Sequence, residues 1–360
     1  MPNINDVLTP NAIKAYFDEY KRNVNTAPYL GEAMFPGVFQ ESLDMKFLTG
    51  EEDMPTVLKP TAYDAEVPLR DRVGVDLIQG EMPFYREGFL IKEVDRRLIQ
   101  KANAAGDPVM KSAVAHIFKD MQRLVDGANS AAERMRWQIL ADANGSPKIT
   151  INANGVNMVY NYDPNQKYYN NNYVALTGTS AWDQYSTSDP VKVLDTARQV
   201  MANKGVRITK AIMNRTTWNN VMQSVSLWNY ALGTNASAGG VIYKSEDIAK
   251  AVIAANAKVE VIIYDKAFKS EAGSVTSYIP DNVVSLVPDG TLGETRYAMT
   301  PEGDKYIGSG DSLVNAVTVG TGIVITHKSY DVPVKEEIIA GQICMPSFEG
   351  MYTTYTIKTV

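Results

Sequence analysis

Apolar positions recur at steps of three and four residues between Pro108 and Asp142, the pattern of one face of a long helix. The stripe consists of Ala113, Ile117, Met121, Leu124, Ala128, Ala131, Met135 and Ile139. Asp107 is a start signal directly before this segment, and Asn144-Gly145 is a stop signal after it. At about 1.5 Å per residue, the helix would be on the order of 50 Å long. We expect it to act as a structural spine.

Residues 1–40 predict an arm rather than a core. Thr9 is placed to cap a short helix whose apolar stripe contains Ile13 and Phe17. The segment Tyr29–Phe39 is apolar but interrupted by Gly and Pro, so we expect an irregular stretch that lies along another surface.

Residues 41–95 predict strands and turns. Apolar and polar residues alternate from Val67 to Leu77, which is the period of a strand. Prolines at 55, 60 and 68 argue against a central strand of a large sheet. Two interpretations remain open: an ordinary exposed hairpin, or a long projecting loop that docks on a neighbouring subunit. A two-stranded ribbon alone is marginally stable, so the loop would need a surface to lean on.

Residues 146–188 differ in composition, with six tyrosines, eight asparagines and few charges. Lys148–Tyr162 predicts a hairpin that turns at Asn152-Ala153-Asn154-Gly155. Aromatic and amide side chains together suit a contact surface, and an exposed polar insertion is the alternative.

From Asp189 onward the pattern is α/β. Asp189-Pro190 opens a predicted helix, and further helices are expected near 217–225 and 245–255. Strands are predicted at 208–214, 259–264 and 283–287, with residues 271–281 as a loop. Residues 314–325 and 354–359 are also β-like, and the stretch 328–350 between them is expected to consist of turns with paired charges.

Charge and composition exclude several classes of protein. The 35 basic and 41 acidic residues give a net charge of −6, unlike proteins whose affinity depends on neutralising phosphates. Only 21% of residues are charged, which suits a protein that buries surface against partners. The longest uncharged stretch, Thr216–Tyr243, is interrupted by polar residues throughout. No segment is apolar enough to cross a bilayer and the N-terminus lacks a signal-peptide pattern, so we expect a soluble protein of a reducing compartment.

Candidate chemistry is sparse. One cysteine, Cys344, and two distant histidines, His116 and His327, exclude a disulfide and a Cys- or His-rich metal centre. Glycine-rich fragments at 308–312 and 319–322 complete neither a P-loop nor a dinucleotide-binding motif. The acidic residues, including Glu81, Glu87, Glu93 and the adjacent Glu336-Glu337, are expected on the solvated surface. We therefore expect no catalytic residue, cofactor or metal.

Several motifs, in this order along the chain, resemble a known family. They are Leu30-Gly31-Glu32-Ala33-Met34-Phe35-Pro36, Asp71-Arg72-Val73-Gly74, Gly80-Glu81-Met82-Pro83-Phe84, Val283–Pro288 with Asp289-Gly290, and Tyr330-Asp331-Val332-Pro333-Val334. Each motif is modest alone, but their order over nearly the whole chain resembles the phage major capsid protein E family of tailed phages.

The resemblance implies an α+β tailed-phage major capsid protein fold. The N-terminal arm would be 1–40 and the extended β-hairpin loop 41–95. A peripheral domain with the long spine helix would comprise 96–145 and 314–360, and an axial α/β domain would comprise 146–313, with 146–188 as a possible insertion. The loop would contact neighbouring subunits through Arg70, Asp71, Arg72, Glu81 and Arg86.

The implied function is a structural head protein, without enzymatic activity or cofactors, that self-assembles into an icosahedral shell around double-stranded DNA. Partners would be copies of itself in pentamers and hexamers, a separate scaffolding protein, a portal and a decoration protein, with no membrane and no sequence-specific DNA binding. The shell would be assembled in the host cytoplasm and become the virion capsid. The alternatives are a nanocompartment shell of the same fold and a cytoplasmic carboxylate-based hydrolase.

Overall fold

A computed structural model describes residues 9–23, 28–50, 75–91, 93, 97, 108–153, 156–232, 244–270, 273–309, 313–331 and 334–360. The chain divides into two compact units, and both are discontinuous in sequence. Unit 1 comprises Met1–Met45, Gln79–Glu133 and Glu294–Ser347. Unit 2 comprises Lys46–Ile78, Arg134–Gly293 and Phe348–Val360.

Unit 1 is organised around a sheet whose central strand is β16 (Val334–Pro346). This strand pairs antiparallel with β4, β15 and β13 along different parts of its length, and β14 and β1 extend the sheet beyond β15 and β13. The bounds of these strands are β1 Gly37–Gln40, β4 Phe84–Ile91, β13 Thr295–Ala298, β14 Val314–Val319 and β15 Ile323–Asp331.

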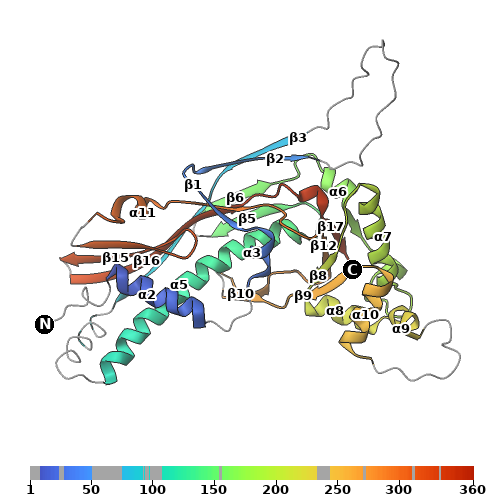
Figure 1. The fold of residues 1–360 in the computed structure, drawn as a ribbon, viewed down its shortest axis with the longest axis horizontal. Helices are drawn as coiled ribbons and strands as arrows, with labels where there is room; N and C mark the ends of the chain where they lie inside the picture. Colours follow the sequence, from blue (N-terminus) through green and yellow to red (C-terminus); the bar gives the residue numbers. More distant parts are fainter. Residues whose placement is uncertain are drawn as a thin grey trace, which may run out of the picture. The chain divides into compact units, whose positions relative to one another are not determined.

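Helices cover both faces of this sheet (Figure 1). On one face, α2 (Pro10–Asn23) and the first part of α5 (Pro108–Leu140) pack against the sheet through a buried cluster. Its members include Ile13, Phe17, Ile117, Met121, Ile325 and Ile338. On the other face, α11 (Pro301–Tyr306) brings Gly303 against Val324 of β15, where an added Cβ would lie 3.0 Å from the valine side chain.

The predicted arm contains a capped helix and is bonded to α5 of the same unit. Thr9 Oγ1 accepts a hydrogen bond from the Ala12 N–H at 3.3 Å, which confirms the predicted cap of α2. The short helix α3 (Leu30–Met34) begins where the Gly31 N–H donates to a buried Glu133 carboxylate oxygen at 2.9 Å. A carboxylate at a helix N-terminus is favourable, and burial strengthens the interaction.

Unit 2 contains a mixed five-stranded sheet in the order β7-β17-β12-β8-β9. The central strand β12 is buried at all five positions, as expected for a strand covered on both faces. β7 lies parallel to β17 and β9 parallel to β8, while the other neighbours are antiparallel. The bounds are β7 Tyr173–Ala175, β8 Lys210–Met213, β9 Glu260–Ile263, β12 Val283–Val287 and β17 Tyr355–Lys358.

Four helices pack against this sheet: α7 (Pro190–Asn203), α8 (Arg215–Gln223), α9 (Val225–Leu232) and α10 (Glu246–Asn256). Three of them begin at side-chain caps, formed by Asp189, Asn214 and Ser245. Their apolar faces bury Leu194, Trp218, Leu227 and Ile253 with Leu286 of the sheet. The local start signals and the 3.6-residue period therefore agree with the packing.

Three two-stranded sheets complete the described structure, together with α6 (Lys167–Asn171) and the 3-10 turns at Gly178–Ser180 and Met351–Thr353. They are β2 (Asp44–Gly50) with β3 (Val75–Glu81), β5 (Lys148–Ala153) with β6 (Val156–Asn161), and β10 (Ala267–Lys269) with β11 (Val275–Ser277). The β5–β6 hairpin confirms the prediction for Lys148–Tyr162.

Three local predictions are wrong. Tyr29–Phe39 is not irregular, since it forms α3 and β1. Residues 271–281 include β11, whose three residues are too few to show a period. The stretch 328–350 is not a series of turns but the end of β15 and the whole of β16, in which adjacent charged residues point to opposite faces of the sheet.

Candidate functional site

The histidines do not form a catalytic group. His327 on β15 is 2% exposed, and its Nε2 lies 3.1 Å from Oε2 of Glu336 on β16. Among the described residues, the partner of the His327 ring is thus a carboxylate and not a serine or cysteine side chain. His116 is exposed on α5. The buried pair therefore satisfies two polar side chains inside the sheet of unit 1.

The described residues meet neither the requirements of a metal site nor those of a membrane-spanning helix. Over the described ranges, no group of three or more His, Cys, Asp or Glu side chains is arranged to hold a metal ion. Within the same ranges, no helix combines the length and apolar character that a bilayer span requires.

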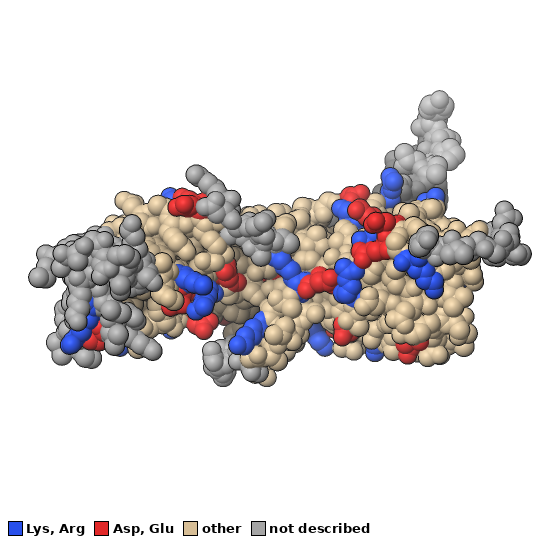
Figure 2. All heavy atoms as spheres, turned by 90° about the horizontal axis from the view of Figure 1, so that it is seen from below, with Lys and Arg blue, Asp and Glu red and all other residues tan. Residues whose placement is uncertain are grey.

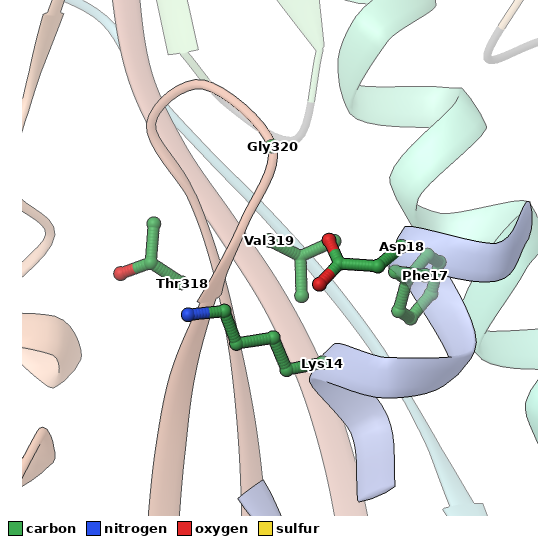
Figure 3. Close-up of a pocket in the computed structure, with 6 residues that line it drawn as sticks. All are labelled: Lys14, Phe17, Asp18, Thr318, Val319 and Gly320. Carbon is green, nitrogen blue, oxygen red and sulfur yellow. The ribbon is translucent and has the colours of Figure 1, made fainter. Parts of the chain in front are cut away.

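Each unit contains a cavity among its described residues. In unit 1, a cavity of about 330 Å³ lies between α2 and the turn that joins β14 to β15. Lys14 extends toward Thr318 and Asp18 lies near Val319, while Gly320 forms the turn (Figure 3). In unit 2, a cavity of about 470 Å³ is lined by 176–184 and Val360. No hydrogen bond between a hydroxyl and a titratable side chain is present in either lining of the described residues.

Charges on the described surface are mixed. Basic and acidic side chains alternate over the face in Figure 2, without a broad field of one sign among the coloured residues. In unit 2, Arg215 bridges Glu246 at 2.6 Å and Asp265 at 3.2 Å, and Lys250 also pairs with Glu246. These contacts raise the pKa of Arg215 and lower the pKa of Glu246, through hydrogen bonds to the charged forms. On this face, the described charges do not form the basic field that phosphate binding needs.

The base of the predicted loop is anchored in unit 2. Asp76 of β3 accepts a hydrogen bond from Lys167 Nζ at 2.8 Å and from Asn165 Nδ2 at 3.4 Å. On β2, Phe47 packs on Tyr162 with ring centroids 5.7 Å apart. The opposite face of this ribbon exposes Leu48 and Leu77, at 58% and 60%. The ribbon thus has one supported face and one exposed face, on which Leu48 and Leu77 lie among polar and charged residues.

The predicted contact residues fall in different places. Arg70, Asp71 and Arg72 lie outside the described residues. Glu81 ends β3 and is exposed. Arg86 on β4 forms an ion pair with Glu302 of α11 at 2.8 Å and lies over the Phe84 ring at 5.5 Å. The structure therefore places Arg86 and Glu81 in unit 1 but brings no cluster of the five together.

Sequence reasoning missed the side chains that hold these surfaces in place. Asn172 Nδ2 donates to the Tyr352 and Thr354 carbonyl oxygens, and Tyr168 bonds the Thr354 and Thr356 hydroxyls. Asp76 and Lys167 are 91 positions apart. The only available signal was the unusual Tyr/Asn composition of 146–188, which indicated a special role but not these partners.

The fold, with its two units and mixed sheets, is similar to that of a structural class of proteins that assemble through contacts between copies. The chain belongs to the family described as phage major capsid protein E, whose model matches residues 11–347. It is a structural shell protein, and the α+β capsid fold expected from the sequence is confirmed.

Two solved structures support the fold. A protein provisionally assigned as a prophage capsid protein of E. coli CFT073 is 11% identical, with a TM-score of 0.59, over 98% of this chain and 99% of that chain. A phage-related protein from Bordetella bronchiseptica RB50 is 15% identical, with a TM-score of 0.52, over 96% of both chains. No curated protein matches the chain significantly.

Proposed function

We propose that copies of this chain form an icosahedral shell of pentamers and hexamers that encloses the double-stranded DNA of a tailed phage. The observation that carries the proposal is the family match across residues 11–347. The net charge of −6 and the mixed surface charges support a container that holds DNA without gripping it. The nanocompartment and hydrolase alternatives are not favoured.

Within this proposal, the arm (1–40) and the loop (41–95) reach over adjacent subunits. Residues 96–145 and 314–360 form the peripheral domain, and residues 146–313 form the axial domain around the five- and six-fold positions. The anchored base of the β2–β3 ribbon supports a projecting loop, because a ribbon of two strands needs such support. Arg70, Asp71, Arg72, Glu81 and Arg86 are the proposed intersubunit contacts.

The proposed assembly uses a separate scaffolding protein, a portal and a decoration protein, and it takes place in the host cytoplasm. The subunit itself has no enzymatic activity in this scheme. The match to a family of capsid proteins supports that part.

Electron microscopy of the full chain, expressed with its head-assembly proteins, tests the proposal. Closed shells with five-fold vertices are expected. A stable monomer that forms no shell under any assembly condition would contradict it.

A further inference from the structure

Strand β6 in unit 2 has an unusually unprotected edge. Its six residues, Val-Asn-Met-Val-Tyr-Asn, contain no charge and no proline. Val159 is 59% exposed and Met158 is 37% exposed, so apolar side chains on both faces of the strand contact solvent. Exposed, uncharged edge strands are templates for pairing with another chain, and proteins normally protect them.

Several other long edge strands in the described chain are protected. β14 is also uncharged, but α2 and α11 pack against it. β4 carries Arg86 and Glu87. The outer edge of β5 is closed by α5, because Gln138 Nε2 donates to the Thr150 carbonyl oxygen at 3.2 Å. β6 is thus the open side of a hairpin whose other side is closed.

The pairing register identifies the backbone groups at this edge. The Tyr162 N–H donates to the Pro147 carbonyl oxygen at 2.9 Å, and Val156 lies opposite Ala153 at the turn. Bonded and non-bonded pairs alternate in an antiparallel ladder, so the N–H and C=O groups of Asn157, Val159 and Asn161 point away from β5. Thr150 lies opposite Val159 on β5, so its backbone groups also point out of the hairpin, in agreement with the bond from Gln138 to its carbonyl oxygen. The described residues provide no backbone partner for Asn157 or Val159.

A second copy of this chain suits the edge. The proposed function already requires copies to meet, and this inference rests on it. A two-fold axis places the same strand on both sides of a contact. Antiparallel self-pairing would bring like charges together in a charged strand, but β6 has none to repel. With Val159 opposite the partner's Val159, and Asn157 opposite the partner's Asn161, all three outward residues pair.

We propose that β6 pairs antiparallel with β6 of a second copy across a two-fold axis of the shell. The two β5–β6 hairpins become one four-stranded sheet, held by backbone hydrogen bonds between subunits. The interface uses strand addition and needs no charged side chain.

A disulfide tests the pairing directly. Facing residues in an antiparallel pair have Cα atoms about 5.5 Å apart, within the range that a disulfide spans. Cys344 is 0% exposed, so an introduced thiol would be the accessible one among the described residues. Shells of Val159→Cys should convert under mild oxidation mainly to disulfide-linked dimers, seen on a non-reducing gel and reversed by reductant. Shells of Asn157→Cys are the matched control and should stay monomeric, because that residue faces the partner's Asn161.

A second pair of variants tests the backbone bonds. Val159→Pro removes an outward N–H and no bond of the β5–β6 ladder, so shell yield should fall at least tenfold while the thermal unfolding of the subunit changes little. Val159→Thr keeps the N–H and should assemble normally. If Val159→Cys shells formed no more disulfide-linked dimer than Asn157→Cys shells, the inference would be overturned and the proposed function would remain intact. Failure of the unmodified chain to form shells would overturn both.

Discussion

Tyr168 and Asn172 show how single buried polar residues hold unit 2 together. Asn172 is 1% exposed and binds two carbonyl oxygens that lie 180 and 182 positions away. Tyr168 is 2% exposed, and its hydroxyl lies 2.8 Å from the Thr356 hydroxyl. Removing one member would take a hydrogen bond from buried polar atoms of its neighbours, at about 1–3 kcal/mol for each atom left unsatisfied. Such residues specify which distant segments meet, and no local pattern reveals their partners.

Tyr168 gives a prediction about alkaline pH. Burial raises the pKa of its hydroxyl to about 12 in the folded chain, against about 10 when unfolded. The stabilising contribution is therefore complete below pH 10 and is lost as the pH rises toward 12, by about 1.4 kcal/mol per pH unit. Tyr168→Phe should reduce the free energy of unfolding by about 1 kcal/mol at pH 7 and show a smaller loss between pH 10 and 12. Denaturant unfolding of both proteins measures this; equal alkaline slopes would contradict it.

At the scale of elements, local signals predict helices better than strands. α2, α5 and α7 each combine a cap or start residue with an apolar period, and all three are present as predicted. β16 was missed because Lys335, Glu336 and Glu337 are adjacent in sequence. In the sheet, Glu336 turns inward to His327 while Glu337 accepts the Tyr330 hydroxyl on the other face. The partner that makes a buried carboxylate tolerable lies on another strand, so the sequence alone hides it.

Replacing glycine by alanine should have opposite effects on stability at two positions, one inside α5 and one just after it. Gly145, in the stop signal after α5, has φ +65°, and an added Cβ would lie 2.3 Å from the Tyr173 ring. Gly145→Ala should therefore destabilise the protein by about 2 kcal/mol or more. Gly127 lies inside α5, and an added Cβ would meet no atom within 4 Å apart from the helix's own backbone. Gly127→Ala should therefore stabilise the protein by about 0.5–1 kcal/mol. Thermal unfolding of both variants measures the two signs; destabilisation by Gly127→Ala would show that its surroundings are less open than described.

At the scale of the whole molecule, the sequence predicted the fold class and the family from the order of parts. It did not predict how the chain returns on itself. Each unit is built from three separate stretches, and the six-stranded and five-stranded sheets each join strands from both halves of the sequence. Contacts between subunits are equally invisible to local patterns, since Arg70, Asp71 and Arg72 were chosen from a resemblance. Their role stays a prediction.

The loop contacts are tested by replacing Asp71 and Arg72 together with alanine. Shell yield should fall several-fold, because the proposed docking loses both charges, while the free energy of unfolding of the subunit changes by less than about 0.5 kcal/mol. Asp304→Ala with Lys305→Ala is the matched control, since it removes an adjacent acidic and basic residue from the exposed surface of α11. Equal yields for both double variants would argue against the loop contact.

The position of β16 has a consequence for biosynthesis. In unit 1, β4, β13 and β15 all pair with β16 at residues 334–346. In unit 2, β17 at residues 355–358 lies between β7 and β12. A ribosome adds about 5–20 residues per second, so most of the chain would exist before either sheet has its last strand. Chains that stop before residue 334 would lack both closing strands. The subunit would therefore become competent to join a shell only after residues 334–358 have been translated, which would keep shorter fragments out of the particle.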